Sequence, residues 1–139
     1  MIPRRQFLWL IAALAGIVLI CGIGGLGLLL SNPFFQPARL IETTQLSPEQ
    51  AAQCRYALGL RATAPVAFEY YAYLDGFLDD QLTCRFRAAH NELAELFDPE
   101  LVDVKRTEAQ PIRPGEHLRL RIEPLDTETI LITGEWYTM

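Results

Sequence analysis

Hydrophobic residues are distributed very unevenly along the chain. Residues 7–30 form a run of 24 residues without a charge, of which 19 are hydrophobic and five are glycine. A helix of that length extends about 36 Å, whereas the hydrocarbon core of a bilayer is about 30 Å thick. The pattern therefore predicts one transmembrane helix at residues 7–30, preceded by a stub of residues 1–6.

A different pattern begins after the apolar run. Residues 31–43 contain two prolines and show no hydrophobic period, so we expect a tether there. Residues 44–139 are expected to form a globular domain. Its first element is a helix that starts at Ser47, because serine, then proline, then Gln50 three positions on is the pattern of a capping box. Gly59 is suited to end that helix.

Alternation of hydrophobic and polar positions predicts most of the strands in this domain. A second helix is expected at residues 89–97, where apolar residues recur with helical spacing and a proline follows. Helix, two strands, helix and two further strands make an α+β domain with a mainly antiparallel sheet and two helices. The expected strands are residues 66–73, 81–87, 117–123 and 129–137, with a short one at 101–105.

Composition supports a small folded domain joined to one membrane segment. The chain has 139 residues with 7 Phe, 5 Tyr and 2 Trp, which is too apolar for a disordered protein. Its net charge of −5 argues against a nucleic-acid-binding protein, because such proteins usually carry a surplus of basic residues. Residues 31–139 carry 10 basic and 17 acidic side chains, a balance of −7.

The charges that flank the apolar run predict its orientation. Arg4 and Arg5 directly precede the run, and Trp9 near the same end suits a membrane interface. After the run, the first basic residue is Arg39. The positive-inside rule therefore predicts a cytoplasmic N-terminus and a domain outside the cell membrane, in the periplasm or the extracellular space.

Three other interpretations of the N-terminal segment stay open. Ala13 and Ala15 make an Ala-x-Ala pattern for signal cleavage, but the apolar stretch before it is short and more follows it. Arg4 and Arg5 begin a sequence that resembles the core of a twin-arginine export signal, although two arginines also precede ordinary anchors. Cys21 could be the acylated residue of a lipoprotein, but isoleucine precedes it where a small residue is required.

Small residues recur four positions apart within the predicted span. Ala12 with Gly16, and Cys21 with Gly25, have the spacing that lets two membrane helices approach closely. The spacing favours a helix partner, although glycine and alanine are common in single spans in any case.

Two cysteines of the predicted domain are expected to form a disulfide. Cys54 lies on the apolar side of the first helix, and Cys84 lies on the apolar face of the strand at 81–87. Outside the cell membrane the environment is oxidising, which favours a bridge over two buried thiols. The pair lacks CxxC spacing, so we expect a structural and not a redox-active bond.

Residues with the chemistry of metal ligands are present but poorly spaced. His90 and His117 have no neighbouring Cys or His at ligand spacing. Asp75, Asp79 and Asp80 cluster in a predicted turn, but their spacing is not that of a calcium loop. The sequence also lacks a GxSxG motif, a glycine-rich phosphate loop and a CxxCH motif. We therefore predict no metal site, no cofactor and no catalytic residue.

One face of the predicted sheet collects side chains that are typical of protein interfaces. Tyr and Arg are enriched at binding hot spots. The alternative is a solvated face on which these arginines pair with neighbouring glutamates. The candidate partner surface comprises Tyr71, Tyr73, Arg85, Arg87, Arg119 and Arg121.

Together these features predict a membrane-anchored interaction module outside the cell membrane. Its expected partners are the bilayer and another membrane protein, of which it would be an accessory subunit. The first alternative is a surface binding protein for a small ligand or a cation, which would use the aspartate-rich turn or the aromatic strand. The second is a small exported hydrolase that works with Glu or Asp side chains.

Overall fold

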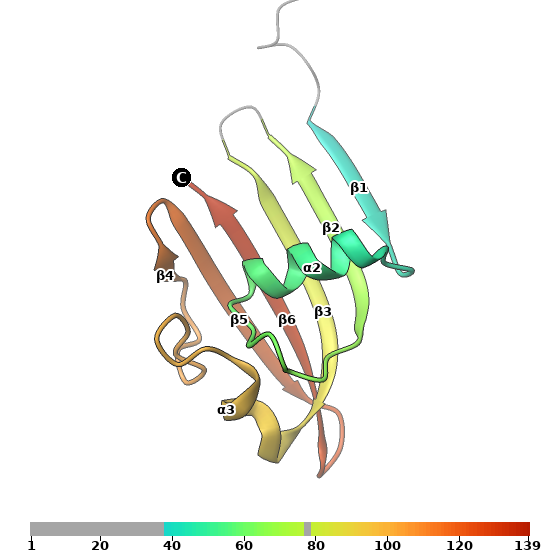
Figure 1. The fold of residues 1–139 in the computed structure, drawn as a ribbon, viewed down its shortest axis with the longest axis vertical. Coiled ribbons are helices and arrows are strands. Elements are labelled where there is room, and N and C mark those ends of the chain that lie inside the picture. Colours follow the sequence, from blue (N-terminus) through green and yellow to red (C-terminus); the bar gives the residue numbers. More distant parts are fainter. Residues whose placement is uncertain (1–37, 77–78) are drawn as a thin grey trace, which may run out of the picture. The chain divides into compact units, whose positions relative to one another are not determined.

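The computed structural model describes residues 38–76 and 79–139, which form a six-stranded sheet and two short helices (Figure 1). In chain order the elements are β1 (Arg39–Thr43), α2 (Pro48–Ala57), β2 (Phe68–Asp75), β3 (Gln81–Ala89), the 3₁₀ turn η2 (His90–Glu92), α3 (Leu93–Leu96), β4 (Gln110–Arg113), β5 (Glu116–Pro124) and β6 (Thr129–Thr138). The predicted α+β class with an antiparallel sheet is confirmed.

Helix α2 starts and ends where the sequence predicts. The Ser47 hydroxyl accepts a hydrogen bond from the Gln50 backbone N–H, and the Gln50 side chain accepts one from the Ser47 N–H at 2.9 Å. These two bonds satisfy donors that the first turn of a helix leaves free. Gly59 follows the helix with a φ of 62°, a left-handed conformation that glycine adopts without a steric penalty.

All neighbouring strands of the sheet are antiparallel. Their order is β1-β2-β3-β6-β5-β4, so β3 and β6 pair at the centre although they are far apart in sequence. Strands β2 and β3, and strands β5 and β6, are joined as hairpins. β1 and β4 are therefore the two edges of the sheet.

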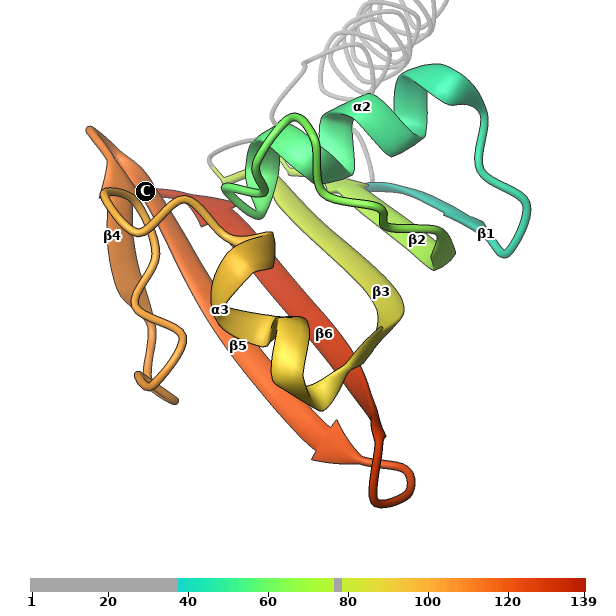
Figure 2. The same ribbon diagram turned by 60° about the horizontal axis from the view of Figure 1, so that its bottom comes forward.

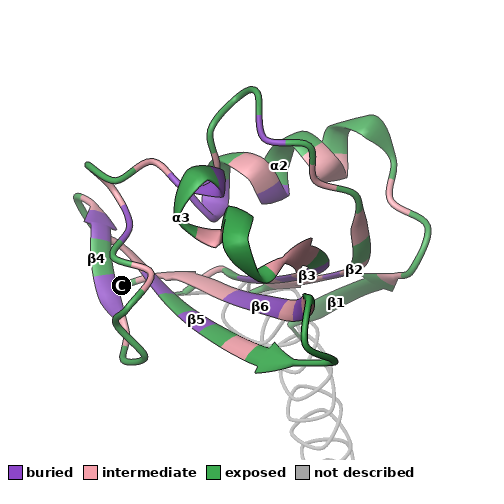
Figure 3. Cartoon of the chain, turned by 90° about the horizontal axis from the view of Figure 1, so that it is seen from below, coloured by how far each residue is buried: buried purple, intermediate pink, exposed green. Residues whose placement is uncertain are grey.

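Both helices lie on one face of the sheet, which we call the covered face (Figures 2 and 3). The core lies between this face and the helices. Leu58, just after α2, packs directly on Gly134 of β6, where a Cβ would come within 2.1 Å of the Leu58 Cδ2 atom. Glycine at this position therefore lets the end of α2 approach the backbone of the sheet. The largest fully buried side chains are Phe86, Phe97, Leu58, Leu82, Leu118, Ile130 and Ile132.

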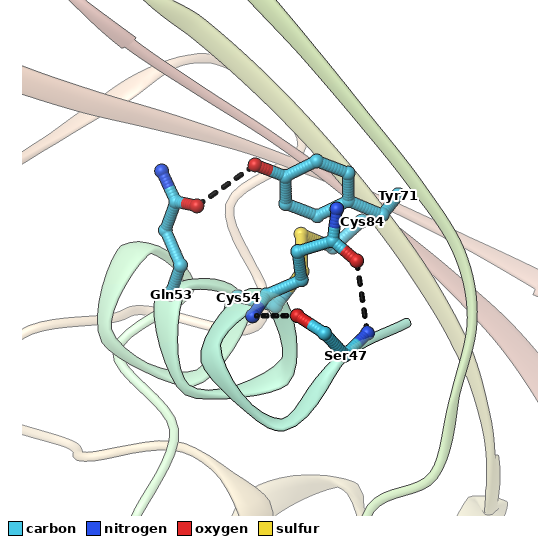
Figure 4. The surroundings of a disulfide bond; sticks show 6 residues. Ser47, Gln53, Cys54, Tyr71 and Cys84 are labelled. Carbon is cyan, nitrogen blue, oxygen red and sulfur yellow. Dashed lines mark hydrogen bonds between the residues drawn. A yellow bond between two sulfur atoms is a disulfide. The ribbon is translucent and has the colours of Figure 1, made fainter. Parts of the chain in front are cut away.

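The predicted disulfide joins the helix layer to the sheet. Cys54 of α2 and Cys84 of β3 are both fully buried, and their Cα atoms are 6.0 Å apart across the S–S bond (Figure 4). Beside the bond, the buried Tyr71 hydroxyl donates to the Gln53 Oε1 atom at 2.8 Å. The prediction of a Cys54–Cys84 bridge is confirmed.

Three predicted boundaries are wrong. The last five residues of the predicted tether form the edge strand β1, which pairs with β2 through Leu40 and Leu74 among others. Residues 101–105 are not a strand; the fourth strand lies at 110–113. Finally, β3 continues to Ala89, so only the short η2 and α3 occupy the predicted helix at 89–97.

Within residues 38–76 and 79–139, no helix is both long enough and apolar enough to cross a bilayer. The predicted span at residues 7–30 lies outside the described residues. The same holds for Arg4, Arg5 and Trp9, on which the predicted orientation rests, and for Cys21.

Candidate functional site

The candidate site is the sheet surface opposite the helices, which we call the open face. No helix of the described part of the chain covers this surface (Figure 3). It consists of the strand positions that alternate with the buried core positions. Its polar and aromatic side chains are Glu42, Tyr70, Thr83, Arg85, Arg87, His117, Arg119, Arg121, Glu123, Thr133, Glu135 and Tyr137.

Two of the six residues predicted for a partner surface lie on the other side of the sheet. Tyr71 is only 3% exposed and is paired with the buried Cys84. Tyr73 is paired with the buried Leu82 and packs against the core. Burial, followed by a hydrogen bond and charge from Asp80, raises the pKa of Tyr73 to about 12. The prediction for these two tyrosines is therefore wrong.

A bulge in β2 explains the error. The register between β2 and β3 shifts between Phe68 and Tyr70, so that Phe68 is paired with Phe86 and Tyr70 with Arg85. One extra residue in a strand reverses the faces of all side chains that follow it. Strict alternation from Phe68 directs Tyr70 inward, whereas the bulge brings Tyr70 to the open face and Tyr71 to the core.

Tyr70 thus replaces Tyr71 beside the arginines of the open face. The Arg85 guanidinium lies over the Tyr70 ring, 5.1 Å from its centroid. The Tyr70 hydroxyl donates to the Glu42 Oε1 atom at 2.8 Å, and this bond, together with burial, raises the pKa of Tyr70. Both contacts fix the ring against β1 and β3. Sequence reasoning missed Tyr70, since only the bulge brings it to this face.

The four predicted arginines all lie on the open face, but in two different environments. Arg87 pairs with Glu69 at 2.8 Å, and Arg119 approaches Glu135 at 3.9 Å. These pairs support, for two arginines, the interpretation of a solvated face with internal ion pairs. Pairs as exposed as these contribute little to stability.

Arg85 and Arg121 have no carboxylate within salt-bridge distance among residues 38–76 and 79–139. Each is the cross-strand neighbour of Thr133, one from β3 and one from β5. Two strand spacings separate their backbones by about 10 Å. The Arg85 Nε atom is buried without a hydrogen-bond partner in this part of the chain. Two cations thus lie on either side of Thr133, which is itself buried.

The histidines and aspartates lie apart from one another. His117 stacks on Tyr137 at the open face with ring centroids 5.5 Å apart, whereas His90 belongs to η2. Among the residues with described positions, no group of three or more His, Cys, Asp or Glu side chains is arranged to hold a metal ion. A shallow depression of about 610 Å³ lies at the β2–β3 hairpin, lined by Leu74, Gly76, Asp79, Gln81, Tyr137, Thr138 and Met139.

A second polar cluster, absent from the sequence predictions, joins α2 to the β4–β5 edge. The Glu116 carboxylate accepts hydrogen bonds from Trp136 Nε1 and Arg113 Nη1, both at 3.0 Å. Arg113 lies 3.9 Å from the centroid of the Tyr56 ring and donates to the Tyr56 carbonyl oxygen at 2.8 Å. Burial opposes ionisation of Glu116, but these bonds outweigh it and lower the pKa of the carboxyl. The cluster stabilises the fold.

Comparison with known proteins adds no further assignment. The chain matches no protein-family model, and neither the search of curated proteins nor that of solved structures finds a match.

Proposed function

We propose that this chain is a non-catalytic interaction module, anchored in the cell membrane by residues 7–30 and exposed outside it. Its partner is another membrane protein, of which it is an accessory subunit. The apolar run and the arginines before it support the anchor and its orientation. The Cys54–Cys84 bond is consistent with an oxidising compartment.

The observation that carries the proposal is that two arginines of the open face form no salt bridge with the described residues. Arg85 and Arg121 flank Thr133 with no carboxylate to neutralise them among the described residues. A guanidinium binds a carboxylate through two parallel hydrogen bonds, and such bonds are stronger than neutral ones. The partner surface that fits is therefore an acidic segment of a membrane protein, with the ordered Tyr70 ring as an aromatic contact beside it.

The position of the domain relative to the anchor supports a partner within the same membrane. Only eight residues, 31–38, separate the predicted span from the first residue of β1. Fully extended, they reach about 28 Å. The domain thus remains close to the bilayer surface, where the exposed loops of membrane proteins lie.

The test is purification of the tagged full-length chain in a mild detergent, followed by native mass measurement and identification of whatever migrates with it. We expect one defined membrane complex with the natural chain, and its loss when Arg85→Gln and Arg121→Gln are combined. The matched control is Lys105→Gln with Arg106→Gln, which removes the same charge from an exposed loop between α3 and β4. Migration of the natural chain alone, or equal loss of the complex in both double variants, would refute the proposal.

The depression at the β2–β3 hairpin favours a second candidate, a binding protein for a small ligand or a cation. Among the described lining residues, Asp79 supplies the carboxylate side chain. Thermal unfolding of the full-length chain with and without Ca²⁺ tests the cation version. A rise in the unfolding temperature that disappears with Asp79→Asn would support it, and an unchanged temperature would contradict it.

A further inference from the structure

We propose that β1 is a dimerisation edge, at which two copies of this chain pair their β1 strands antiparallel and join their sheets. This inference goes beyond the proposed function, because it concerns the edge of the sheet and a second copy of the chain rather than the open face and another protein.

Strand β1 is an unpaired edge that exposes two hydrophobic side chains. It pairs with β2 on one side, and no described strand lies on its other side. Leu40 is 59% exposed and Ile41 is 38% exposed, and they point to opposite faces of the sheet. An edge of this kind leaves backbone N–H and C=O groups unpaired and is a template for another strand. Arg39–Thr43 contains no proline and pairs with β2 without a bulge, and its two charged residues, Arg39 and Glu42, are of opposite sign.

The opposite edge, β4, shows how this fold protects a strand. Pro111 removes a backbone donor, and the register between β4 and β5 shifts between Pro111 and Arg113. The Arg113 side chain is held by Glu116 and by the Tyr56 carbonyl oxygen. Proline and bulges are the devices by which natural sheets block pairing at an edge. Proline and a bulge therefore protect the β4 edge, whereas β1 has neither.

The predicted anchor favours a second copy of this chain as the partner that pairs with β1. Eight residues, 31–38, separate the predicted span from β1, so in two copies anchored in one membrane the same short segment would limit how far each β1 strand can lie from the bilayer. Confinement to one surface also raises the local concentration of one strand around the other. In the predicted helix at residues 7–30, the small residues at 12 and 16, and at 21 and 25, have the spacing that lets two copies pack closely.

Symmetry limits the possible registers to those in which one residue lies opposite itself, and the proposed register is the one centred on Ile41. Two identical antiparallel strands are related by an axis perpendicular to the sheet, so a residue at the centre of the pairing lies opposite itself. Centring on Ile41 brings the two isoleucines together and places Leu40 opposite Glu42 of the second copy. Directly opposite β-branched side chains stabilise antiparallel pairs. Centring on Glu42 would instead oppose two carboxylates, which is unfavourable.

Disulfide cross-linking in membranes tests this register. In a Cys21→Ala background, Ile41→Cys should form an interchain disulfide under mild oxidation, since Cβ atoms directly opposite each other lie about 5 Å apart. The matched control is Leu125→Cys, a hydrophobic residue that is 48% exposed in the β5–β6 turn. We expect cross-linking of Ile41→Cys to be about tenfold faster than that of the control.

Mixed membranes distinguish strand pairing from association through the anchors alone. Co-expressed Leu40→Cys and Glu42→Cys chains should cross-link to each other faster than Leu40→Cys chains cross-link among themselves. In mild detergent each particle should contain two copies of the natural chain, whereas Ile41→Pro should leave one copy per particle with an intact Cys54–Cys84 bond. Equal cross-linking of Ile41→Cys and Leu125→Cys, no preference in the mixed membranes, or a monomeric natural chain would each overturn the proposal.

Discussion

Reduction of the Cys54–Cys84 bond should remove a large part of the stability of the domain. The bond joins residues 30 apart in sequence, and closing a loop of that length lowers the entropy of the unfolded chain by about 12 cal/mol/K. At 25 °C this corresponds to about 3.6 kcal/mol. Small domains are stable by only about 5–15 kcal/mol in total. The loss should therefore be visible in any equilibrium unfolding measurement.

The assay is urea unfolding of the full-length chain in mild detergent, followed by Trp136 fluorescence in a Trp9→Phe background. Oxidised and reduced forms of the same chain are compared, since reduction breaks the link without removing a buried side chain. We expect a midpoint lower by about 2–3 M urea and a steeper transition, because the unlinked unfolded chain exposes more surface. Combined Cys54→Ala and Cys84→Ala should lose at least as much, because both positions are fully buried. Reduced and oxidised chains that agree within about 1 kcal/mol, with equal slopes, would refute the reasoning.

Three further predictions concern individual side chains and are measured by the same unfolding assay. Gly134→Ala should destabilise by about 1–3 kcal/mol because its Cβ clashes with Leu58, and the loss should be smaller in a Leu58→Ala background. Tyr71→Phe should cost about 1 kcal/mol, since it leaves the hydrogen bond to Gln53 unmade; an unchanged midpoint would contradict the 2.8 Å contact. In the folded state burial raises the pKa of Glu116, but hydrogen bonds from an indole and a guanidinium outweigh burial and lower it. The ionised Glu116 side chain therefore stabilises the fold above the ordinary pKa of 4.5, and this stabilisation is lost as the pH falls through the folded value. Glu116→Gln should therefore destabilise the domain near pH ~7, and this loss should shrink as the pH falls below 4.5.

Elements with strong local signals were predictable from the sequence. The cap of α2 depends on Ser47 and Gln50 alone, which are three residues apart. β3, β5 and β6 each have one face in the core and one outside it, so their hydrophobic residues alternate. The facing cysteines of α2 and β3 followed from these two patterns together.

The edge strands were not predictable, because their pairing depends on contacts that are distant in sequence. Four of the five residues of β1 are exposed, so no face of the strand is marked by hydrophobic residues. In β4 a glutamine is buried: the Gln110 side chain accepts from the Asp103 N–H at 2.8 Å and donates to the Asp103 carbonyl oxygen at 3.0 Å. A buried polar residue of this kind gives no hydrophobic period.

The candidate site was predicted in part for the same reason. The four arginines lie on strands with regular alternation, and all four reach the open face. The two tyrosines follow the bulge in β2, whose position depends on pairing with β3. A single inserted position reversed their faces without leaving any mark in the local sequence.

The disulfide also determines how the domain responds to tension applied between residue 38 and its C-terminal end. A pull at residue 38 acts first on β1, the edge strand, which can be unzipped from β2 one hydrogen bond at a time. Unravelling can then continue through α2 only as far as Cys54, where the load passes through the sulfur bridge to Cys84 in the centre of the sheet. Residues 55–83, which include β2, are bypassed and carry no load. The bond thus removes residues 55–83 from the length of chain that tension can draw out.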